Sequence, residues 1–373
     1  MKIAILKERA AGETRVAATP ETVKKFIGLG TEVAVEKGAG ATASITDEAY
    51  AEAGAVVGTA AATVKGADIV LGIQAPEVDA LKGAAPGAWV AALFDPFQKR
   101  ELVDAYAEAG FEALSMEFMP RITRAQSMDV LSSQSNLAGY KAVIHAADTY
   151  GRAFPMMMTA AGTVQAAKCF IMGVGVAGLQ AIATARRLGA QVSATDVRSA
   201  TKEQIESLGA KAIFVTDVEG IEGEGSGGYA TEMSDEYKAA QAKLVSEHIA
   251  KQDIVITTAL IPGRAAPVLI TDAQIASMKP GSVIFDLAVA QGGNVEGSKA
   301  DAVVEKHGVK IIGYANTPAH LAADASALFA RNHFNFLSAF WDKEAGKPEL
   351  DEEIGDAIRL TKDGAVVSER LKG

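Results

Sequence analysis

A glycine-rich turn near the middle of the chain has the spacing that binds the pyrophosphate of a dinucleotide. It follows the apolar stretch 168–172, leads into the helical stretch 179–188, and reads Gly173, Val174, Gly175, Val176, Ala177, Gly178. Gly173 allows a tight turn, Gly175 lets backbone N–H groups approach the phosphates, and Gly178 lets helix and strand pack closely. The helix N-terminus adds positive potential. The pattern therefore predicts a dinucleotide site at this turn.

A carboxylate at the end of the next expected strand indicates which dinucleotide binds. This strand covers 191–195 and is followed by Asp196, which lies roughly 20 residues after the turn, where a carboxylate can accept hydrogen bonds from the adenosine ribose. The same carboxylate repels a 2′-phosphate, so we expect NAD to be preferred to NADP. Arg198 lies nearby, and an arginine can accommodate a 2′-phosphate, so this preference has a counter-argument.

A polar loop at 120–129 offers groups that can recognise a nicotinamide ring. Arg121, Gln126 and Asp129 supply a guanidinium, an amide and a carboxylate, and Ser132 adds a hydroxyl one turn into the next helix. A nicotinamide carboxamide both donates and accepts hydrogen bonds, so this set can fix the orientation of the ring. Helix capping by Asp129 or Ser127 is the alternative, and for Asp129 we weigh the two equally.

A second loop, 219–233, is rich in glycine and contains Tyr229. So long an irregular run is uncommon inside a compact domain unless it is a lid or is disordered. We expect Tyr229 to close over bound nucleotide. The alternative is an acidic insertion without a role.

Two runs of alternating strands and helices must position these loops. The first run predicts strands at 2–6, 32–35, 68–73, 89–94 and 112–116, with helices between them such as 20–28. The second run predicts six strands, the number in a complete doubly wound dinucleotide fold, at 168–172, 191–195, 211–215, 253–259, 282–287 and 310–314. We therefore expect an α/β protein with two Rossmann-like, doubly wound domains.

Segments outside the two runs indicate how the domains connect. A long helix at 131–150 is expected to link them, and an apolar helix at 324–341 and a hairpin at 354–367 are expected to return to the first domain. The prediction is a discontinuous N-terminal domain, 1–130 and 320–373, an inserted nucleotide domain, 131–319, and a ligand cleft between them.

Composition excludes several classes of protein. The net charge is −10 over 373 residues, with both signs interspersed, which argues against a nucleic acid partner. A single cysteine, Cys169, cannot form an internal disulfide and is expected to be a small buried residue in a reducing cytoplasm. The stretch 153–185 carries one charge, Lys168, but Pro155 and the glycine turn interrupt it. We expect a buried strand and helix there, with no direct membrane insertion.

These residues also resemble a known family. Nearly end to end, the chain is similar to domain I, the NAD(H)-binding component, of the proton-translocating nicotinamide nucleotide transhydrogenases, in the alanine dehydrogenase/transhydrogenase superfamily. The likeness is carried by Lys7-Glu8-Arg9 with Thr14-Arg15-Val16-Ala17, the loop 120–129, Ser133-Gln134-Ser135-Asn136 with Ala138-Gly139-Tyr140, the glycine turn, Gly227-Gly228-Tyr229-Ala230, and 257–263.

The resemblance assigns roles to individual residues. It implies that Arg121, Gln126 and Asp129 position the nicotinamide ring, and it places Gly228 and Tyr229 in a mobile loop. It makes nucleotide contacts of Val176, Asp196, Val197, Arg198 and Leu260. Ser127, Met128, Ser132, Ala177 and Ala259 complete the predicted cofactor-binding set, which contains no metal ligand.

The resemblance also implies an activity and partners. The expected enzyme is the alpha subunit of a Re/Si-specific, proton-translocating NAD(P)⁺ transhydrogenase. It passes hydride directly between NAD(H) bound here and NADP(H) on domain III, the beta subunit, while membrane domain II moves protons. A homodimer at the cytoplasmic face of the inner membrane, held there through partner subunits, is expected.

Alanine dehydrogenases are the main rival, because they share the N-terminal pattern and the glycine turn. By resemblance, their substrate chemistry needs a lysine and a histidine in the first domain. The matching stretches here, 71–76 and 91–95, contain neither residue, and the five histidines, which we expect at the surface or on helices, lie elsewhere. Hydride transfer between two nicotinamides needs positioning and no general acid or base. A module that senses NAD(H) without turnover is the third possibility.

Overall fold

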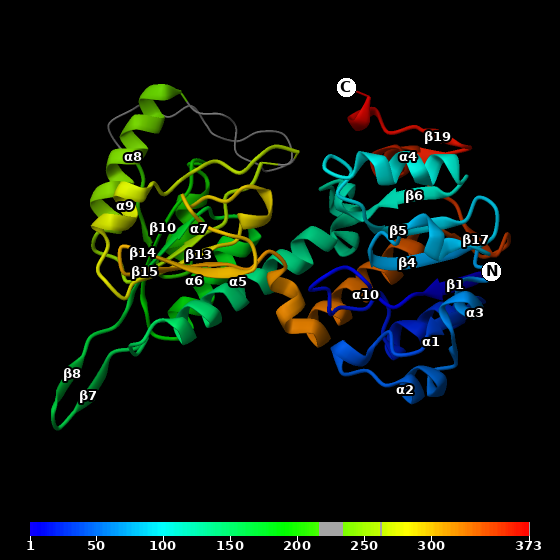
Figure 1. Cartoon of the computed structure of the whole chain (residues 1–373), viewed down its shortest axis with the longest axis horizontal. Coiled ribbons are helices and arrows are strands. Elements are labelled where there is room, and N and C mark those ends of the chain that lie inside the picture. Colours follow the sequence, from blue (N-terminus) through cyan, green and yellow to red (C-terminus); the bar gives the residue numbers. More distant parts are fainter. Residues whose placement is uncertain (216–233, 262, 373) are drawn as a thin grey trace. The chain divides into compact units, whose positions relative to one another are not determined.

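The structure is a computed structural model that describes residues 1–215, 234–261 and 263–372. The chain divides into two compact units, whose elements are labelled in Figure 1. Unit 1 comprises Met1–Gln134 and Ala319–Gly373, and unit 2 comprises Ser135–Pro318. The unit boundary falls within helix α5 (Val130–Thr149) and within the short helix η6 (Thr317–Leu321).

Unit 1 is built on a six-stranded sheet in which every pairing is parallel. The strand order is β3-β2-β1-β4-β5-β6, so the direction of winding reverses between β1 and β4. The strands are β1 (Lys2–Ile5), β2 (Glu32–Glu36), β3 (Val56–Gly58), β4 (Ile69–Gln74), β5 (Trp89–Leu93) and β6 (Glu112–Ser115).

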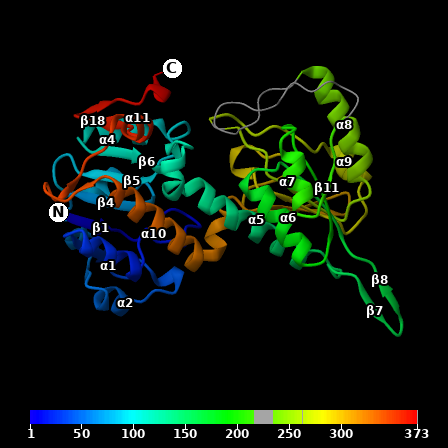
Figure 2. The same ribbon diagram turned by 180° about the vertical axis from the view of Figure 1, so that it is seen from behind.

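Helices cover the faces of this sheet because their apolar residues join one buried core. They are α1 (Pro20–Gly28), α2 (Asp47–Glu52), α3 (Ala60–Val64), α4 (Arg100–Glu108), α10 (Ala322–Ala339) and α11 (Glu352–Ile358). Thr19 and Thr22 form a capping box at the start of α1 and Pro20 occupies its first turn. Helix α10 lies beside α1 (Figure 2), where the rings of Phe26 and Phe334 meet edge to face at 5.7 Å. The chain thus returns from unit 2 to complete the core of unit 1.

Unit 2 contains a seven-stranded sheet in the order β11-β10-β9-β12-β13-β15-β14. Apart from the antiparallel edge strand β14, the pairings are parallel, and the order is that of a dinucleotide-binding doubly wound fold. The strands are β9 (Lys168–Met172), β10 (Gln191–Thr195), β11 (Lys211–Ala212), β12 (Ile254–Thr257), β13 (Val283–Asp286), β14 (Ala302–Lys306) and β15 (Val309–Gly313). Besides most of α5, its described α-helices are α6 (Val176–Arg187), α7 (Thr201–Ser207), α8 (Asp235–Ile249) and α9 (Asp272–Ser277).

Alternate residues of the central strands enter separate cores on the two faces of this sheet. Cys169 and Ile171 of β9 face one core, and Phe170 and Met172 face the other. Strands covered on both faces read as continuous apolar runs, which is why these segments were predictable. Cys169 is fully buried, as expected, and burial raises the pKa of its thiol to about 12.

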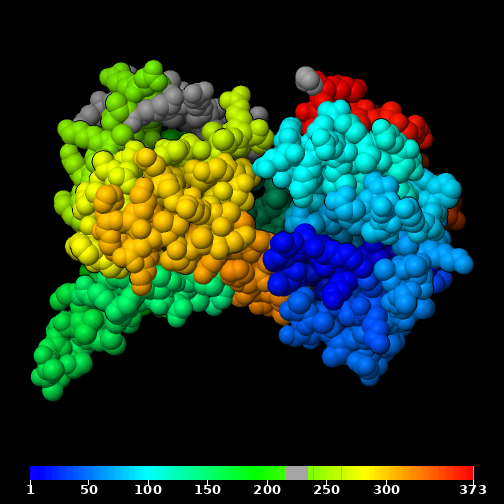
Figure 3. All heavy atoms as spheres, in the orientation of Figure 1, coloured from blue at the N-terminus to red at the C-terminus, as the bar shows by residue number. Residues whose placement is uncertain are grey.

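A two-stranded hairpin, β7 (Met157–Thr159) and β8 (Gly162–Val164), projects from the body of unit 2 (Figures 1 and 3). Three consecutive methionines, Met156, Met157 and Met158, are exposed on it, Met158 to 80%. The expectation that the stretch beginning at 153 is a buried strand and helix was therefore wrong for the hairpin and correct from β9 onward. The low charge of this stretch belongs to an exposed apolar surface.

The tail also differs from the prediction. Residues 354–358, expected in a hairpin, lie in α11, whose first turn is capped by Asp351. The hairpin is confined to β18 (Thr361–Lys362) and β19 (Ala365–Val366). The remaining short pair is β16 (Trp341–Asp342) with β17 (Lys347–Pro348). Among the helices of the described ranges, none combines the length and apolar character needed to cross a bilayer.

Candidate nucleotide-binding site

The glycine turn joins β9 to α6 as predicted, and internal packing requires two of its three glycines. Gly173 has φ +97°, and a Cβ there would lie 2.6 Å from the hydroxyl of Thr258. A Cβ at Gly178 would lie 1.9 Å from the carbonyl oxygen of Gly173. Larger residues at these two positions would separate the strand from the helix.

At Gly175, in contrast, packing within the described residues does not require a glycine. It is the N-cap of α6, with φ −80° and ψ −164°, which other residues adopt readily. A Cβ there would meet no atom of the described residues within 4 Å. Within the described residues, no side-chain cap is present at Gly175 and the first turn of α6 has no acidic residue, which leaves its first N–H groups and the positive end of the helix dipole available to a ligand. The turn therefore fits an anionic group of a ligand that approaches the backbone closely.

Asp196 lies directly after β10 and connects the glycine turn to the loop that follows β10. Its carboxylate accepts a hydrogen bond of 2.6 Å from the backbone N–H of Val174 and one of 2.9 Å from that of Arg198. The guanidinium of Arg198 donates two further bonds, each 2.9 Å. Burial acts to raise the pKa of Asp196, but these hydrogen bonds outweigh it and hold the pKa below its usual value. The carboxylate is therefore ionised at neutral pH and Arg198 is engaged by it.

The segment after β12 lies against the glycine turn. The hydroxyl of Thr258 donates to the carbonyl of Gly173 at 3.0 Å, and its backbone N–H donates to the carbonyl of Met172 at 2.9 Å. Ala259 and Leu260 follow, and Leu260 exposes 37% of its surface. Together with Val176, Ala177 and Val197, which are half-buried, these residues surround the carboxyl edge of the sheet in unit 2. Unit 2 thus brings together all of its predicted site residues within the described ranges.

The predicted nicotinamide loop belongs to unit 1, where it is more ordered than a simple connector. Residues Thr123–Met128 form a short helix, η4. Asp129 accepts hydrogen bonds from the backbone N–H of Ser132 at 2.9 Å and from its hydroxyl at 2.5 Å, as an N-cap of α5 does. Asp129 was predicted either to cap the helix or to contact the cofactor, and in the structure it caps the helix. The side chain of Gln126 is exposed and makes no hydrogen bond with the described part of the chain, whereas Met128 is buried in the core.

Helix α10 holds this loop through its carbonyl at Ser127. The amides of Asn332 and Asn335 both donate to that oxygen, at 2.8 and 3.0 Å. Arg124 is also fixed, because its guanidinium pairs at 2.5 Å with Asp351 and with Glu353, at the start of α11. Arg121 is exposed. The exposed amide of Gln126 is thus carried on a segment that is held through the backbone carbonyl of Ser127 and through the side chain of Arg124.

The carboxyl edge of the sheet in unit 1 is occupied by acidic side chains of the protein itself. Glu8 accepts from the backbone N–H groups of Ile73 and Gln74, at 2.7 and 3.3 Å. Burial, reinforced by the nearby charge of Glu13, raises the pKa of Glu8 to about 7. Glu13 in turn forms a buried ion pair with Arg15 at 2.6 Å and accepts from the amide of Gln74 at 3.2 Å. The backbone N–H groups of Ile73 and Gln74, which could bind a small anion, are therefore already paired.

The same pattern recurs after β5. The backbone N–H groups of Phe94 and Asp95 donate to Glu117, at 2.8 and 2.6 Å. Burial raises the pKa of this carboxyl. An alanine dehydrogenase is expected to carry its lysine and histidine in the stretches 71–76 and 91–95. Here, backbone N–H groups of both stretches donate to glutamate side chains.

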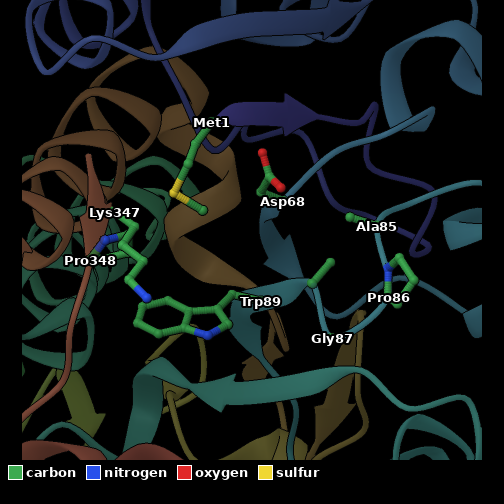
Figure 4. Close-up of a pocket in the computed structure, with 9 residues that line it drawn as sticks. Met1, Asp68, Ala85, Pro86, Gly87, Trp89, Lys347 and Pro348 are labelled. Atoms are coloured by element: carbon green, nitrogen blue, oxygen red, sulfur yellow. The ribbon is translucent and has the colours of Figure 1, made fainter. Parts of the chain in front are cut away.

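Two hollows of unit 1 are not lined by the residues predicted to position the nicotinamide. One, of about 250 Å³, is drawn in Figure 4 and lies where β1, β4 and β5 begin, between Met1, Asp68, Trp89 and Lys347. The other, of about 560 Å³, is lined by Arg124 and by residues around Trp341 and Asp351. Neither contains Arg121, Gln126 or Asp129.

Some predicted residues cannot be placed, and some supporting residues were missed. Gly228 and Tyr229 lie outside the described residues. The histidines lie at the surface or on helices, as expected. His333 of α10 is completely buried, and burial lowers its pKa to about 4. Sequence reasoning missed Asp286 and Asn294, which support the segment after β12. The sequence signals that could have identified them are a carboxylate at the end of an apolar strand, for Asp286, and a preceding pair of glycines, for Asn294.

Comparison with known proteins agrees with this geometry. The N-terminal domain model of the alanine dehydrogenase/PNT family matches residues 4–138, and the C-terminal domain model matches residues 142–369. A Rhodospirillum rubrum protein, named as the first part of NAD(P) transhydrogenase subunit alpha, is 54% identical over 384 residues, covering 100% of this chain and 99% of that protein. Its namesake from Rickettsia prowazekii is 48% identical, covering 99% and 96%.

Solved structures give the same result. A transhydrogenase from Sinorhizobium meliloti has 54% identity and a TM-score of 0.90, covering 98% of this chain and 100% of that one. An L-alanine dehydrogenase shares the fold at 24% identity, with a TM-score of 0.82 over 100% and 98% of the two chains. The chain therefore belongs to the alanine dehydrogenase/PNT family, among the NAD(P) transhydrogenase alpha subunits.

Proposed function

We propose that this chain binds NAD(H) and presents it to an NADP(H)-binding partner domain, so that hydride passes directly between the two nicotinamides, with proton translocation coupled through a membrane partner. The observation that carries the proposal is Gly175. It is the one glycine of the turn whose absent side chain leaves open space outside the helix instead of allowing internal packing. That space, at an uncapped helix N-terminus, fits a pyrophosphate.

The residues of unit 2 divide the task of holding the dinucleotide. The N–H groups at the start of α6 would receive the pyrophosphate, and Asp196 would face the adenosine ribose. Because Arg198 is bound to Asp196 by two hydrogen bonds, a 2′-phosphate would have to displace that pair. This arrangement supports NAD(H) over NADP(H) as the nucleotide of this chain.

In unit 1, the exposed amide of Gln126 would orient the carboxamide of the nicotinamide, on a loop fixed by α10. Asp129 would act through Ser132 and the start of α5, as a positioning residue. When bound, the dinucleotide supplies the hydride, and no side chain of the protein has to exchange a proton with it.

The occupied carboxyl edge of unit 1 argues against the rival activity. An alanine dehydrogenase must bind the carboxylate of pyruvate, but Arg15 is paired with Glu13 and also donates to Gln134 at 2.9 Å. Glu8 and Glu117 occupy the adjacent backbone N–H groups. A negatively charged substrate would therefore meet acidic side chains at this edge, where the N–H groups of Ile73 and Phe94 are already paired.

We also propose that the chain forms a homodimer through the β7–β8 hairpin. Three adjacent exposed methionines on a projecting hairpin form the kind of apolar surface that protein partners cover. A second copy of the chain is the partner that the family resemblance implies.

The test of the proposed function is a mixed assay. The chain is combined with NADH, NADP⁺ and an NADP(H)-binding transhydrogenase domain, without any oxo acid, and formation of NADPH is followed. NADPH formation that needs both proteins supports the proposal. Tight NADH binding without turnover would identify a sensor instead, and oxidation of alanine by the isolated chain would identify a dehydrogenase.

A further inference from the structure

We propose that Asn294 is a positioning residue for NAD(H): its buried amide fixes Ala259 and Leu260 beside the glycine turn. The inference rests on the proposed function, because it describes how unit 2 shapes the same nucleotide site. Asn294 is completely buried, so it acts through the segment that it holds and not by touching the nucleotide.

The side chain of Asn294 pairs with both backbone groups of one residue. Its Oδ1 accepts from the N–H of Ala259 at 3.0 Å, and its Nδ2 donates to the carbonyl of Ala259 at 2.9 Å. Nδ2 also donates to the carbonyl of Pro267 at 2.8 Å. Two opposed hydrogen bonds to a single residue fix both its position and its orientation, as a partner strand would. The bond to Pro267 ties Asn294 to a second residue that follows Ala259 in the sequence.

Asn294 is itself fixed by a buried carboxylate. Asp286, at the end of β13, accepts from the backbone N–H of Asn294 at 3.0 Å and from the hydroxyl of Ser298 at 2.7 Å. The intervening Gly293 has φ +84°, and a Cβ there would lie 2.7 Å from a carboxylate oxygen of Asp286. Since Asp286 is fully buried, moving Asn294 would take a hydrogen bond away from a buried carboxyl group, which is costly. The amide therefore has one available position.

The positioned segment continues directly to the glycine turn. Thr258, next to Ala259, donates its hydroxyl to the carbonyl of Gly173. On the other side, Leu260 presents an exposed apolar side chain. A series of hydrogen bonds thus connects Asp286, through Asn294 and the segment that it holds, to the glycine turn. The same segment carries the side chain of Leu260, which is suited to packing against the nucleotide.

The test compares Asn294→Ala with a matched control, Gln252→Ala. Gln252 is also a buried amide, 4% exposed, and its Nε2 donates to the carbonyl of His248 at 3.1 Å. It precedes β12, whereas Ala259 follows it, so the control removes amide hydrogen bonds at the opposite end of the same strand. Unfolding temperature, the NADH dissociation constant from fluorescence titration, and hydride-transfer kinetics with the partner domain are measured for each.

We expect Asn294→Ala to raise the NADH dissociation constant and KM at least tenfold, with kcat at saturating NADH reduced less than threefold. Gln252→Ala should change the dissociation constant less than twofold at a comparable loss of unfolding temperature. If the two variants raised the NADH dissociation constant equally, Asn294 would contribute only to general stability, and the inference would be overturned. A wild-type chain that does not bind NADH would instead refute the proposed function.

Hydrogen exchange of the wild-type chain keeps the inference testable if Asn294→Ala does not fold. Without nucleotide, the amide of Ala259 should exchange at least a hundredfold more slowly than an unpaired loop amide, because Asn294 holds it. Exchange of Ala259 at the rate of an unpaired amide would show that the segment is not fixed before binding, and would overturn the inference.

Discussion

Replacing Gly175 by alanine should separate nucleotide binding from folding. Because its φ and ψ suit alanine and the added Cβ would meet no atom within 4 Å in the part of the chain that the structure describes, the free energy of unfolding should change by less than about 1 kcal/mol. The methyl group would lie between the α6 N–H groups and the pyrophosphate. Losing one hydrogen bond to a charged group and part of the helix-terminus attraction corresponds to about 2–4 kcal/mol, so NADH binding should weaken at least tenfold.

Two other glycine variants complete this experiment. Gly178→Ala places a Cβ 1.9 Å from the carbonyl of Gly173 and should lower the unfolding free energy by about 1–3 kcal/mol or more. Gly151→Ala, another position in unit 2 with open space around the added Cβ, should change neither property. Stability is measured by denaturant unfolding and affinity by calorimetry. A Gly175→Ala protein that binds NADH as tightly as the wild type would refute the assignment of the turn.

Three further predictions concern single side chains. Gln126→Ala should slow hydride transfer far more than it weakens NADH binding, and equal losses would argue against a positioning role. The pKa of Glu8 is raised to about 7, so Glu8 stabilises the fold fully below pH 4.5 and loses that contribution as the pH rises through 7. Glu8→Gln should therefore gain about 2.5 kcal/mol of unfolding free energy over the wild type between pH 5 and 8.5. A pH-independent difference between the two proteins would contradict this. Met158→Asp should convert a dimer to monomers in sedimentation at unchanged unfolding temperature, and an unaltered dimer would exclude the hairpin as its interface.

Much of the fold was predictable because local pattern and tertiary context agree. Helix α1 occupies the predicted range, since Thr19, Pro20 and an amphipathic pattern mark its start and face. The buried strands β9, β12 and β13 also lie within the predicted ranges, because both of their faces are apolar. Strand β10 lies within its range too, but only one of its faces, with Val192 and Ala194, is apolar. Strands β3 and β14 were missed. Both are edge strands with exposed positions, and edge strands carry a weaker apolar signal.

The site was predictable only where a motif is contiguous. The glycine turn and Asp196 belong to one strand–turn–helix–strand unit, and the structure contains that unit. The role of Asn294 depends on pairing with Ala259, which only the folded sheet brings into contact with it. The hairpin at Met157 was misjudged because exposed and buried methionines look alike in a hydropathy pattern.

The central claim is that hydride passes directly between two nicotinamides, and an isotope experiment tests it most directly. NADH carrying deuterium at the transferred position of C4 is mixed with NADP⁺, this chain and the NADP(H)-binding domain, and the product is analysed by mass spectrometry. Direct transfer predicts that NADPH contains the deuterium and the solvent contains none. Deuterium released into water, or NADPH formed without the label, would contradict the account.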